Sequence, residues 1–304
     1  MTAEAGAATR CGFVALIGAP NVGKSTLVNA LVGSKVTIVS SKVQTTRALI
    51  RGIVIDHNAQ IILVDTPGIF QPRRRLDRAM VSTAWRGAHD ADLVCALLDA
   101  RAGLDDEADD ILARLAGVGH EKILVLNKID LVPREKLLAL AKAANDRLPF
   151  AKTFMVSALS GDGVDDLRAS LGEMLPAGPF LYPEDQISDA PMRQLAAEIT
   201  REKIYRKLHQ ELPYQSTVET DSWTERKDHS VRIEQTIFVE RESQRKIVLG
   251  KGGTTIKAIG ADSRKEIAEI LGVPVHLFLF VKVRENWGDD PDRYRQMGLE
   301  FPRE

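Results

Sequence analysis

Eight residues from Gly18 to Ser25 have the types and spacing that bind phosphate. They read Gly-Ala-Pro-Asn-Val-Gly-Lys-Ser, so two glycines enclose four residues and a lysine and a serine follow. In such a loop the backbone N–H groups converge on phosphate oxygens, the lysine neutralises the β- and γ-phosphates, and the hydroxyl binds Mg²⁺. We expect the whole segment to contact a nucleoside triphosphate: Gly18, Ala19, Pro20, Asn21, Val22, Gly23, Lys24, Ser25 and Thr26.

The sequence on both sides favours this interpretation over a chance glycine-rich turn. The apolar run 13–17 predicts a buried strand, and residues 26–31 predict a helix. A helix N-terminus attracts an anion because its first N–H groups have no partner within the helix.

A second motif, Asp-Thr-Pro-Gly, spans residues 65–68 directly after the apolar run 61–64. An aspartate at a strand end beside the phosphate loop can hold Mg²⁺ through a water, and the N–H of the glycine can meet the γ-phosphate. Alone, the motif is also a good turn sequence. Its place at a strand end favours the nucleotide site, and we expect five residues to line it: Asp65, Thr66, Pro67, Gly68 and Ile69.

A third motif selects the base. Residues 127–130 read Asn-Lys-Ile-Asp and follow the apolar run 122–126. The carboxylate of the aspartate can accept hydrogen bonds from N1–H and the 2-amino group of guanine, a donor pair that adenine lacks. Ser-Ala at 157–158 ends another predicted strand, where a backbone N–H can reach guanine O6. The expected guanine contacts are Asn127, Lys128, Ile129, Asp130, Ser157 and Ala158.

Together these segments resemble the translation-factor-like branch of P-loop GTPases. A threonine between the first helix and the next strand can then close onto Mg²⁺ and the γ-phosphate, and residues 44–47, Gln-Thr-Thr-Arg, lie there. Spacing does not decide between Thr45 and Thr46; we favour Thr46 slightly. The expected Mg²⁺ ligands are Ser25, Thr46 and Asp65, and the expected catalytic residues are Lys24, Thr46 and Gly68.

The resemblance has one departure. Ile69 stands where Ras-like enzymes carry a glutamine that orients the attacking water. We therefore expect slow intrinsic hydrolysis or a group supplied from elsewhere. GTPases with this replacement often resemble enzymes that use K⁺ as the positive charge, so K⁺ held by Asn21 is a hypothesis. The alternative is that Asn21 only shapes the loop.

Composition sets the outer limits. The chain has 304 residues, 44% of them hydrophobic, and a net charge of −1, which predicts a soluble chain of about two domains. It contains no apolar run long enough to span a membrane, and residues 1–10 lack the pattern of a secretion signal. The only cysteines are Cys11 and Cys95, far apart; Cys95 lies in an apolar run and is expected to be buried. These features predict a cytoplasmic protein.

Predicted strands and helices alternate over residues 11–178, which is typical of an α/β domain whose mostly parallel sheet has helices on both faces. We expect the ligand at the carboxyl ends of the strands. Several prolines follow, and residues 179–191 are predicted to be a linker.

Residues 192–285 predict a smaller α+β domain. The expected order is a helix over 192–210, strands over 216–224 and 231–240, a helix, a glycine-rich turn, a helix over 254–271 and a strand over 275–283. The turn Gly-Lys-Gly-Gly at 250–253 resembles the clamp of a type II KH domain, which holds about four unpaired bases. A tail over 286–304 follows.

Basic residues outnumber acidic ones around this turn, which predicts contact with a nucleic-acid backbone. A solvated helix face is the alternative. The expected RNA-binding residues are Arg245, Lys246, Gly250, Lys251, Gly252, Gly253 and Lys257. A second basic run, 73–75, could touch RNA or a partner, but we favour a solvated loop.

The combination of both domains, with the linker segment Tyr-Pro-Glu-Asp-Gln at 182–186, resembles the Era family over nearly the whole chain. The resemblance implies a cytoplasmic, Mg²⁺-dependent switch that binds GTP and GDP. It also implies binding to the 3′ end of small-subunit (16S) rRNA, a role in small-subunit maturation, partial association with the inner membrane, and a monomer.

Other classes of function are weighed beside this one. The chain could be a GTP-regulated RNA-binding or membrane-associated cell-cycle factor without a direct role in ribosome assembly. A metabolic ATPase is disfavoured by Asp130, and a silent GTPase domain is disfavoured by intact Lys24, Ser25 and Asp65. We also expect nucleotide state and RNA affinity to influence each other.

Overall fold

The computed structural model describes residues 8–42, 44–209, 211–285 and 287–302. Residues 1–7, the end of the predicted helix at residue 210, and the tail residues 286, 303 and 304 lie outside these ranges. The described chain forms two units. We call residues 10–174 the N-terminal unit and residues 192–283 the C-terminal unit.

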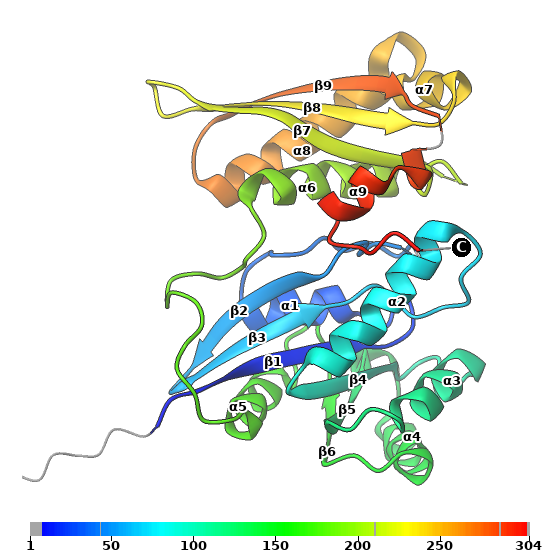
Figure 1. The fold of residues 1–304 in the computed structure, drawn as a ribbon, viewed down its shortest axis with the longest axis vertical. Coiled ribbons are helices and arrows are strands. Elements are labelled where there is room, and N and C mark those ends of the chain that lie inside the picture. The colour runs from blue at the N-terminus through cyan, green and yellow to red at the C-terminus, as the bar shows by residue number, and fades with distance from the viewer. Residues whose placement is uncertain (1–7, 43, 210, 286, 303–304) are drawn as a thin grey trace, which may run out of the picture.

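The N-terminal unit is built on a six-stranded sheet of order β2-β3-β1-β4-β5-β6 (Figure 1). All neighbours pair in parallel except β2 and β3. In chain order the elements are β1 (Arg10–Ile17), α1 (Lys24–Val32), β2 (Ile50–Asp56), β3 (Ala59–Asp65), α2 (Arg75–Asp90), β4 (Leu93–Asp99), α3 (Asp106–Leu115), β5 (Glu121–Asn127), the short η1 (Ile129–Leu131), α4 (Arg134–Arg147), β6 (Lys152–Val156) and α5 (Val164–Met174).

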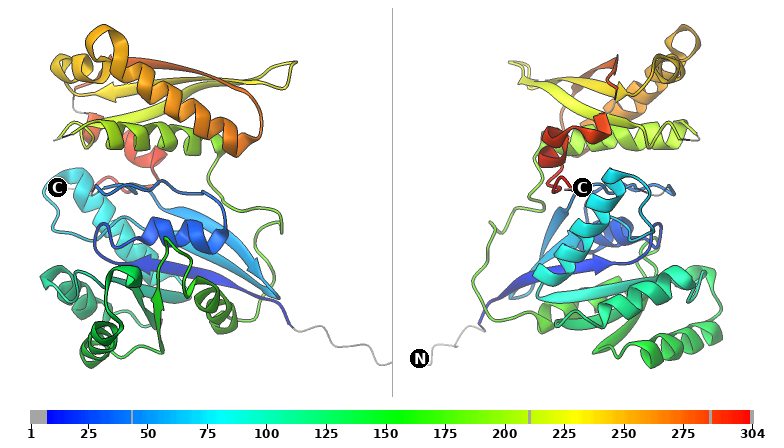
Figure 2. Two further views of the ribbon diagram at one scale, coloured as in Figure 1. Left: turned by 180° about the vertical axis from the view of Figure 1, so that it is seen from behind. Right: turned by 45° about the vertical axis from the view of Figure 1, so that its right-hand side comes forward.

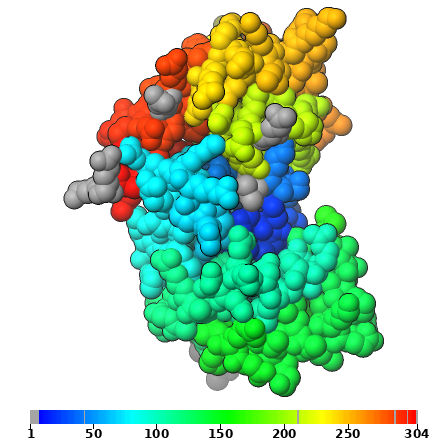
Figure 3. All heavy atoms as spheres, turned by 90° about the vertical axis from the view of Figure 1, so that its right-hand side faces the viewer, coloured from blue at the N-terminus to red at the C-terminus, as the bar shows by residue number. Residues whose placement is uncertain are grey.

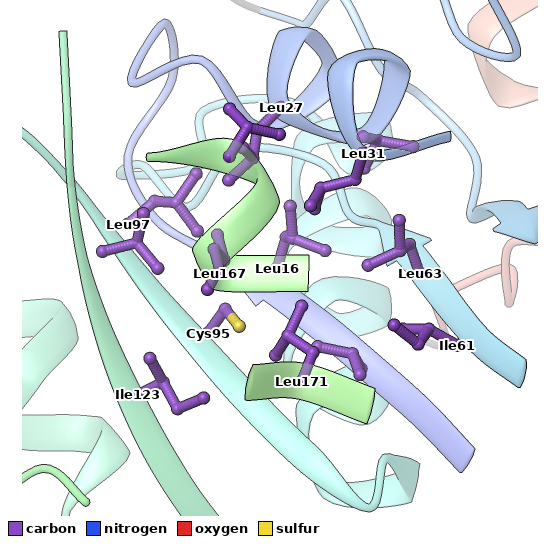
Figure 4. Close-up of a cluster of buried hydrophobic side chains, with 14 of the residues drawn as sticks. Leu16, Leu27, Leu31, Ile61, Leu63, Cys95, Leu97, Ile123, Leu167 and Leu171 are labelled. Atoms are coloured by element: carbon purple, nitrogen blue, oxygen red, sulfur yellow. The ribbon is translucent and has the colours of Figure 1, made fainter. Parts of the chain in front are cut away.

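Helices cover both faces of this sheet, each over its own apolar cluster. Helices α1 and α5 bury Leu27, Leu31, Leu167 and Leu171 against the strands on one face (Figure 4). Helices α2, α3 and α4 pack on the other face. Cys95 lies in the first cluster and is buried, as predicted. The predicted mostly parallel α/β fold is therefore confirmed.

The C-terminal unit is a three-stranded sheet with helices on one side (Figure 2). Its elements are α6 (Met192–Lys207), β7 (Ser216–Glu225), β8 (Val231–Val239), α7 (Glu242–Leu249), η2 (Lys251–Gly253), α8 (Thr254–Leu271) and β9 (Val275–Val283). Strands β7 and β8 pair antiparallel, and β8 and β9 pair in parallel. This is the predicted order of elements, although α6 ends three residues before the predicted bound because Leu208 is extended.

The connection between the units follows the edge of the first sheet. Its backbone pairs with β2 through the Ile53 N–H, which donates to the Ile187 carbonyl at 2.9 Å. The side chain of Gln60 bonds the backbone of Leu181 and Tyr182. The linker is thus fixed to the N-terminal unit along much of its length.

The tail returns to the N-terminal unit. It forms η3 (Trp287–Asp289) and α9 (Pro291–Gln296), and it shares an apolar cluster with α2 that includes Met80, Trp287 and Tyr294. In Figure 3 the tail atoms lie against those of α2. Among the described residues, no helix combines the length and apolar character needed to cross a membrane.

The basic run 73–75 is a solvated loop only in part: Arg73 and Arg74 are exposed and precede the first helix residue, as predicted, whereas Arg75 is half-buried. Arg75 begins helix α2, and Arg74 precedes it as the N-cap residue. Arg74 pairs with Glu211 at 3.0 Å, and Arg75 with Asp289 of the tail at 3.5 Å. Both arginines therefore connect α2 to later parts of the chain.

Candidate nucleotide site and basic turn

The phosphate loop lies between the end of β1 and the start of α1. Lys24 is the first residue of α1, and Gly23 caps the helix without a side-chain hydrogen bond. The Lys24 ammonium is buried and donates to the carbonyls of Gly18 (2.9 Å) and Ala19 (2.8 Å). Burial lowers the pKa of Lys24 to about 8, and the nearby Asp65 carboxylate opposes that shift. A buried ammonium held only by neutral carbonyls suits an anionic ligand.

A cluster of oxygen atoms lies at the end of β3. Asp65 Oδ2 accepts hydrogen bonds from Ser25 (2.8 Å), Thr37 (2.9 Å) and Thr46 (3.1 Å), and the Ser25 and Thr46 hydroxyls are 3.0 Å apart. Asp65 Oδ1 is buried without a hydrogen-bond partner. Burial raises the pKa of Asp65, and the three hydroxyl bonds oppose that shift. One carboxylate with hydroxyls at this distance fits Mg²⁺, which prefers oxygen ligands and retains waters and substrate phosphates.

The two threonines of residues 44–47 face different ways. Thr46 joins the oxygen cluster, whereas the Thr45 hydroxyl bonds Ser40 Oγ (2.6 Å) and the Lys42 carbonyl (2.7 Å). The structure thus brings Thr46, not Thr45, beside Ser25 and Asp65. Sequence reasoning missed Thr37, because a lone threonine in an irregular segment has no distinguishing pattern.

The Asp-Thr-Pro-Gly segment packs closely against the phosphate loop. A side chain at position 68 would place its Cβ 2.9 Å from Pro20 Cα, so only glycine fits there. The next N–H, of Ile69, donates to the Gly18 carbonyl at 3.1 Å. The Ile69 side chain is buried in the apolar cluster of α2 and α3, and Thr66 and Pro67 are buried too. After Asp65, this segment therefore offers backbone rather than side chains to a ligand.

The base-recognition motif is held by one buried asparagine. Asn127 Nδ2 donates to the Val22 carbonyl at 2.8 Å, and Asn127 Oδ1 accepts from the N–H groups of Lys128 and Ala158. The phosphate loop and the two base-binding segments are thereby joined. Asn127 acts as a brace between them, in addition to any contact with the base edge.

The remaining residues of this motif differ in their exposure. Asp130 is exposed on η1 and free to face a base, with Ile129 half-buried beside it. Lys128 pairs with Asp99 at 2.6 Å, a partner that the sequence did not predict. The Ser157 N–H already donates to the Asp162 carbonyl at 2.9 Å. The Ala158 N–H likewise donates to Asn127 Oδ1. A hydrogen bond from residues 157–158 to guanine O6 therefore requires one of these two N–H groups to donate to both acceptors.

A cavity of about 420 Å³ lies beside the phosphate loop. It is lined by Asn21, Lys24, Ser25, Thr26, Thr46, Gly68 and Lys128, among others. Asn21 has a positive φ of 62°, and its carbonyl accepts a hydrogen bond from the Lys128 ammonium at 2.5 Å. Most of the predicted phosphate contacts and two of the three predicted metal ligands thus line one hollow, and of the predicted base contacts only Lys128 does.

The basic turn joins α7 to α8. Gly252 has a φ of 61° with open space where a Cβ would project, so the backbone there can be approached closely. Lys246, Lys251 and Lys257 are exposed around it. Arg245 is engaged within the unit, with Glu242 at 2.9 Å and the Val281 carbonyl at 3.3 Å. Ile247 is 54% exposed on α7, an apolar surface beside the turn that the sequence analysis did not single out.

The sheet, the phosphate loop and the guanine motif define a P-loop GTPase, joined to a KH-type unit. Known families agree. A family model described as "50S ribosome-binding GTPase" matches residues 13–128, and one for the KH domain matches residues 211–288. The GTPase Era of Bradyrhizobium diazoefficiens is 85% identical over 301 residues, which covers 99% of this chain and 98% of that protein. The GTPase Era of Rhizobium meliloti is 67% identical over 302 residues, covering 99% and 96%.

The chain belongs to the Era family of GTPases. It is also similar to a crystal structure of Era in complex with MgGDPNP and nucleotides 1506–1542 of 16S ribosomal RNA, with a TM-score of 0.89 and 37% identity. That comparison covers 95% of this chain and 99% of the other. A structure of Aquifex aeolicus Era bound to GDP and AlF₄⁻ matches equally well, with a TM-score of 0.89.

Proposed function

We propose that this chain is a GTP-hydrolysing switch that binds the 3′ end of 16S rRNA and assists maturation of the small ribosomal subunit. The observation that carries the proposal is the similarity over almost the whole chain to an Era bound to MgGDPNP and to that RNA. Both functional surfaces of this chain lie in the matched region.

In this proposal the phosphate loop and Lys24 hold the β- and γ-phosphates, and the Gly68 N–H meets the γ-phosphate. Ser25, Thr46 and, through water, Asp65 hold Mg²⁺, whose chemistry is to neutralise charge on the phosphate oxygens. The burial and short hydroxyl–carboxylate distances at Asp65 support these assignments. Asp130 selects guanine, with Asn127 and Lys128 positioning its loop.

The experiment for the RNA assignment is crosslinking of cellular RNA to the full chain, beside a Gly252→Asp variant. The variant places a negative charge in a backbone conformation that disfavours side chains, at the point of close RNA approach. We expect recovery of the 16S rRNA 3′ end with the parent and its loss with the variant. Recovery of unrelated RNA with the parent would favour the alternative of a general RNA-binding or membrane-associated cell-cycle factor.

We propose that K⁺ supplies a positive charge at the phosphates and so compensates for Ile69, which cannot orient the attacking water as a glutamine does. Its support is Asn21, which lines the cavity with its backbone in an unusual conformation. GTP turnover measured in Na⁺ and K⁺ buffers of equal ionic strength tests this, with faster turnover expected in K⁺. Equal rates would assign Asn21 to loop shape alone.

The domain bounds and location belong to the same proposal. We assign residues 11–178 to the GTPase domain, 179–191 to the linker, 192–285 to the KH domain and 286–304 to the tail. We further propose a cytoplasmic monomer with peripheral association at the inner membrane. Flotation of the full chain with anionic vesicles tests the membrane part, and sedimentation tests the monomer.

A further inference from the structure

The segment that carries Thr46 is bound by the C-terminal unit. Arg47, the next residue, is 3% exposed, and its guanidinium points out of the N-terminal unit. It donates to the Ser216 carbonyl at 2.8 Å, the Tyr205 hydroxyl at 3.0 Å and the Tyr214 carbonyl at 3.0 Å. Its guanidinium carbon also lies 5.4 Å from the centre of the Trp287 ring. Each of these partners lies in α6 or later in the chain.

A second arginine makes the reciprocal contact. Arg201 on α6 is 1% exposed and donates to the carbonyls of Gln44 (3.4 Å) and Thr45, while it pairs with Glu198 of its own helix. Each unit thus places a buried arginine against the other unit's backbone carbonyls. The two sets of contacts lie on the two sides of Thr46.

The start of the same segment is anchored as well. Glu202 of α6 is fully buried, pairs with Lys35 at 2.6 Å and accepts a hydrogen bond from the Val39 N–H at 3.2 Å. Residues 35–47 therefore contact α6 at both ends. The Thr46 hydroxyl lies inside this span, 3.0 Å from Ser25 and 3.1 Å from Asp65.

We propose that Arg47 and Arg201 are positioning residues for GTP hydrolysis: the C-terminal unit holds Thr46 at the metal site through them. The inference rests on the proposed role of Thr46. Buried guanidinium groups and carbonyls lose their partners if Thr46 leaves the site, so departure of Thr46 is coupled to breaking the contact between the units. The C-terminal unit is then part of the hydrolytic machinery as well as an RNA-binding unit.

The test uses the full chain with the variants Arg47→Lys and Tyr205→Phe. Lysine keeps the charge but cannot reach several acceptors at once, and phenylalanine keeps the ring but removes one acceptor. We expect kcat to fall about tenfold for Arg47→Lys and about threefold for Tyr205→Phe, with a higher Mg²⁺ concentration for half-maximal turnover. GDP affinity should stay within about twofold, because a threonine that closes on the γ-phosphate is not needed for GDP. Arg226→Lys, on the exposed hairpin between β7 and β8, is the matched control.

A double-variant cycle separates positioning from general destabilisation. If Arg47 acts through Thr46, Thr46→Ala combined with Arg47→Lys loses no more activity than Thr46→Ala alone. The inference would be overturned if the losses of kcat from the two substitutions multiplied in the double variant, or if Arg47→Lys left kcat unchanged. It would also be overturned if Arg47→Lys lowered GDP affinity and thermal stability as much as it lowered kcat. Retention of full Mg²⁺-dependent turnover by Thr46→Ala would instead overturn the proposed role of Thr46, which is a distinct result.

Discussion

Asn127 shows how one buried side chain can organise a binding site. Its amide joins the phosphate loop, the Lys128 backbone and the Ala158 backbone, so three segments keep fixed relative positions before any ligand binds. Asp130 is then free to use its carboxylate on the base. Within this one motif, Asn127 therefore holds the loops in place and Asp130, in our proposal, recognises the base.

Asp130→Asn tests the recognition half of this division. An amide can donate where the carboxylate only accepts, so it matches the 2-oxo group of xanthine in place of the 2-amino group of guanine. We expect GTP affinity to fall by at least about a hundredfold and XTP to become the preferred nucleotide, measured by competitive binding. Asp146→Asn, an exposed change on α4, is the control. Unchanged preference for GTP would contradict the assignment.

Cys95 gives a prediction on pH. Burial raises the pKa of its thiol to about 12, from an ordinary value of 9.0. Between these values the unfolded chain releases the thiol proton and the folded chain retains it. Stability conferred by the protonated thiol is therefore lost as pH rises above 9, with a slope of up to about 1.4 kcal/mol per pH unit.

The measurement is the free energy of unfolding from denaturant titrations between pH 8 and 10.5. Cys95→Ala should be less stable at pH 8, because it leaves a small cavity, but its stability should fall less steeply above pH 9. Parallel curves for parent and variant would contradict the prediction.

Helix α9 depends on its packing against α2. Tyr294 is fully buried, donates to the Gly288 carbonyl at 2.7 Å and meets the Phe301 ring edge-on at 4.9 Å between centroids. A six-residue helix such as α9 is too short to be stable alone in water. Its structure therefore comes from packing against α2.

Tyr294→Ala should release the tail from α2. We expect the free energy of unfolding to fall by about 3 kcal/mol, because the packing around the ring is lost. We also expect early proteolytic cleavage between residues 287 and 302, which mass spectrometry can detect. Tyr294→Phe keeps the ring and loses one hydrogen bond, so its cleavage should stay close to that of the parent. Equal cleavage of all three proteins would mean that the ring does not hold the tail.

Strands and long helices were predictable because their patterns are local. The apolar runs at β1, β3, β4 and β5 and the alternation in β8 gave the elements and their order. The start of α2 at Arg75 was not predictable, since the three consecutive arginines at 73–75 are typical of a solvated segment. The acidic partners of Arg74 and Arg75 lie far along the chain, where no local pattern reveals them.

The proposed RNA contact at the basic turn of the C-terminal unit predicts how affinity should depend on salt. If the turn contacts about four nucleotides, the logarithm of RNA affinity should fall with the logarithm of salt with a slope of about −3. Lys251→Ala should make that slope shallower by about 0.7, because one phosphate contact is lost. Lys227→Ala, on the exposed hairpin after β7, is the matched control. A slope near zero would exclude phosphate contacts as the main source of affinity.

The candidate nucleotide site was predictable from motifs, but the contact between the units was not. Arg47 and Arg201 look like ordinary charged residues in sequence, yet each is buried and contacts the backbone of the other unit. Most of their acceptors in the other unit are backbone carbonyls, which every residue carries and which therefore leave no signature. The folded arrangement of both units was needed to find them.

The linker has a consequence for solubility. Strand β2 ends the six-stranded sheet, and its outward N–H and carbonyl groups form a ready template for another chain. Residues 187–189 occupy part of that edge, through the Ile53–Ile187 hydrogen bond and the Arg51–Asp189 ion pair at 2.7 Å. A chain that stops at residue 178 would uncover this edge and should self-associate as its concentration rises, whereas one that continues to residue 190 should stay dispersed.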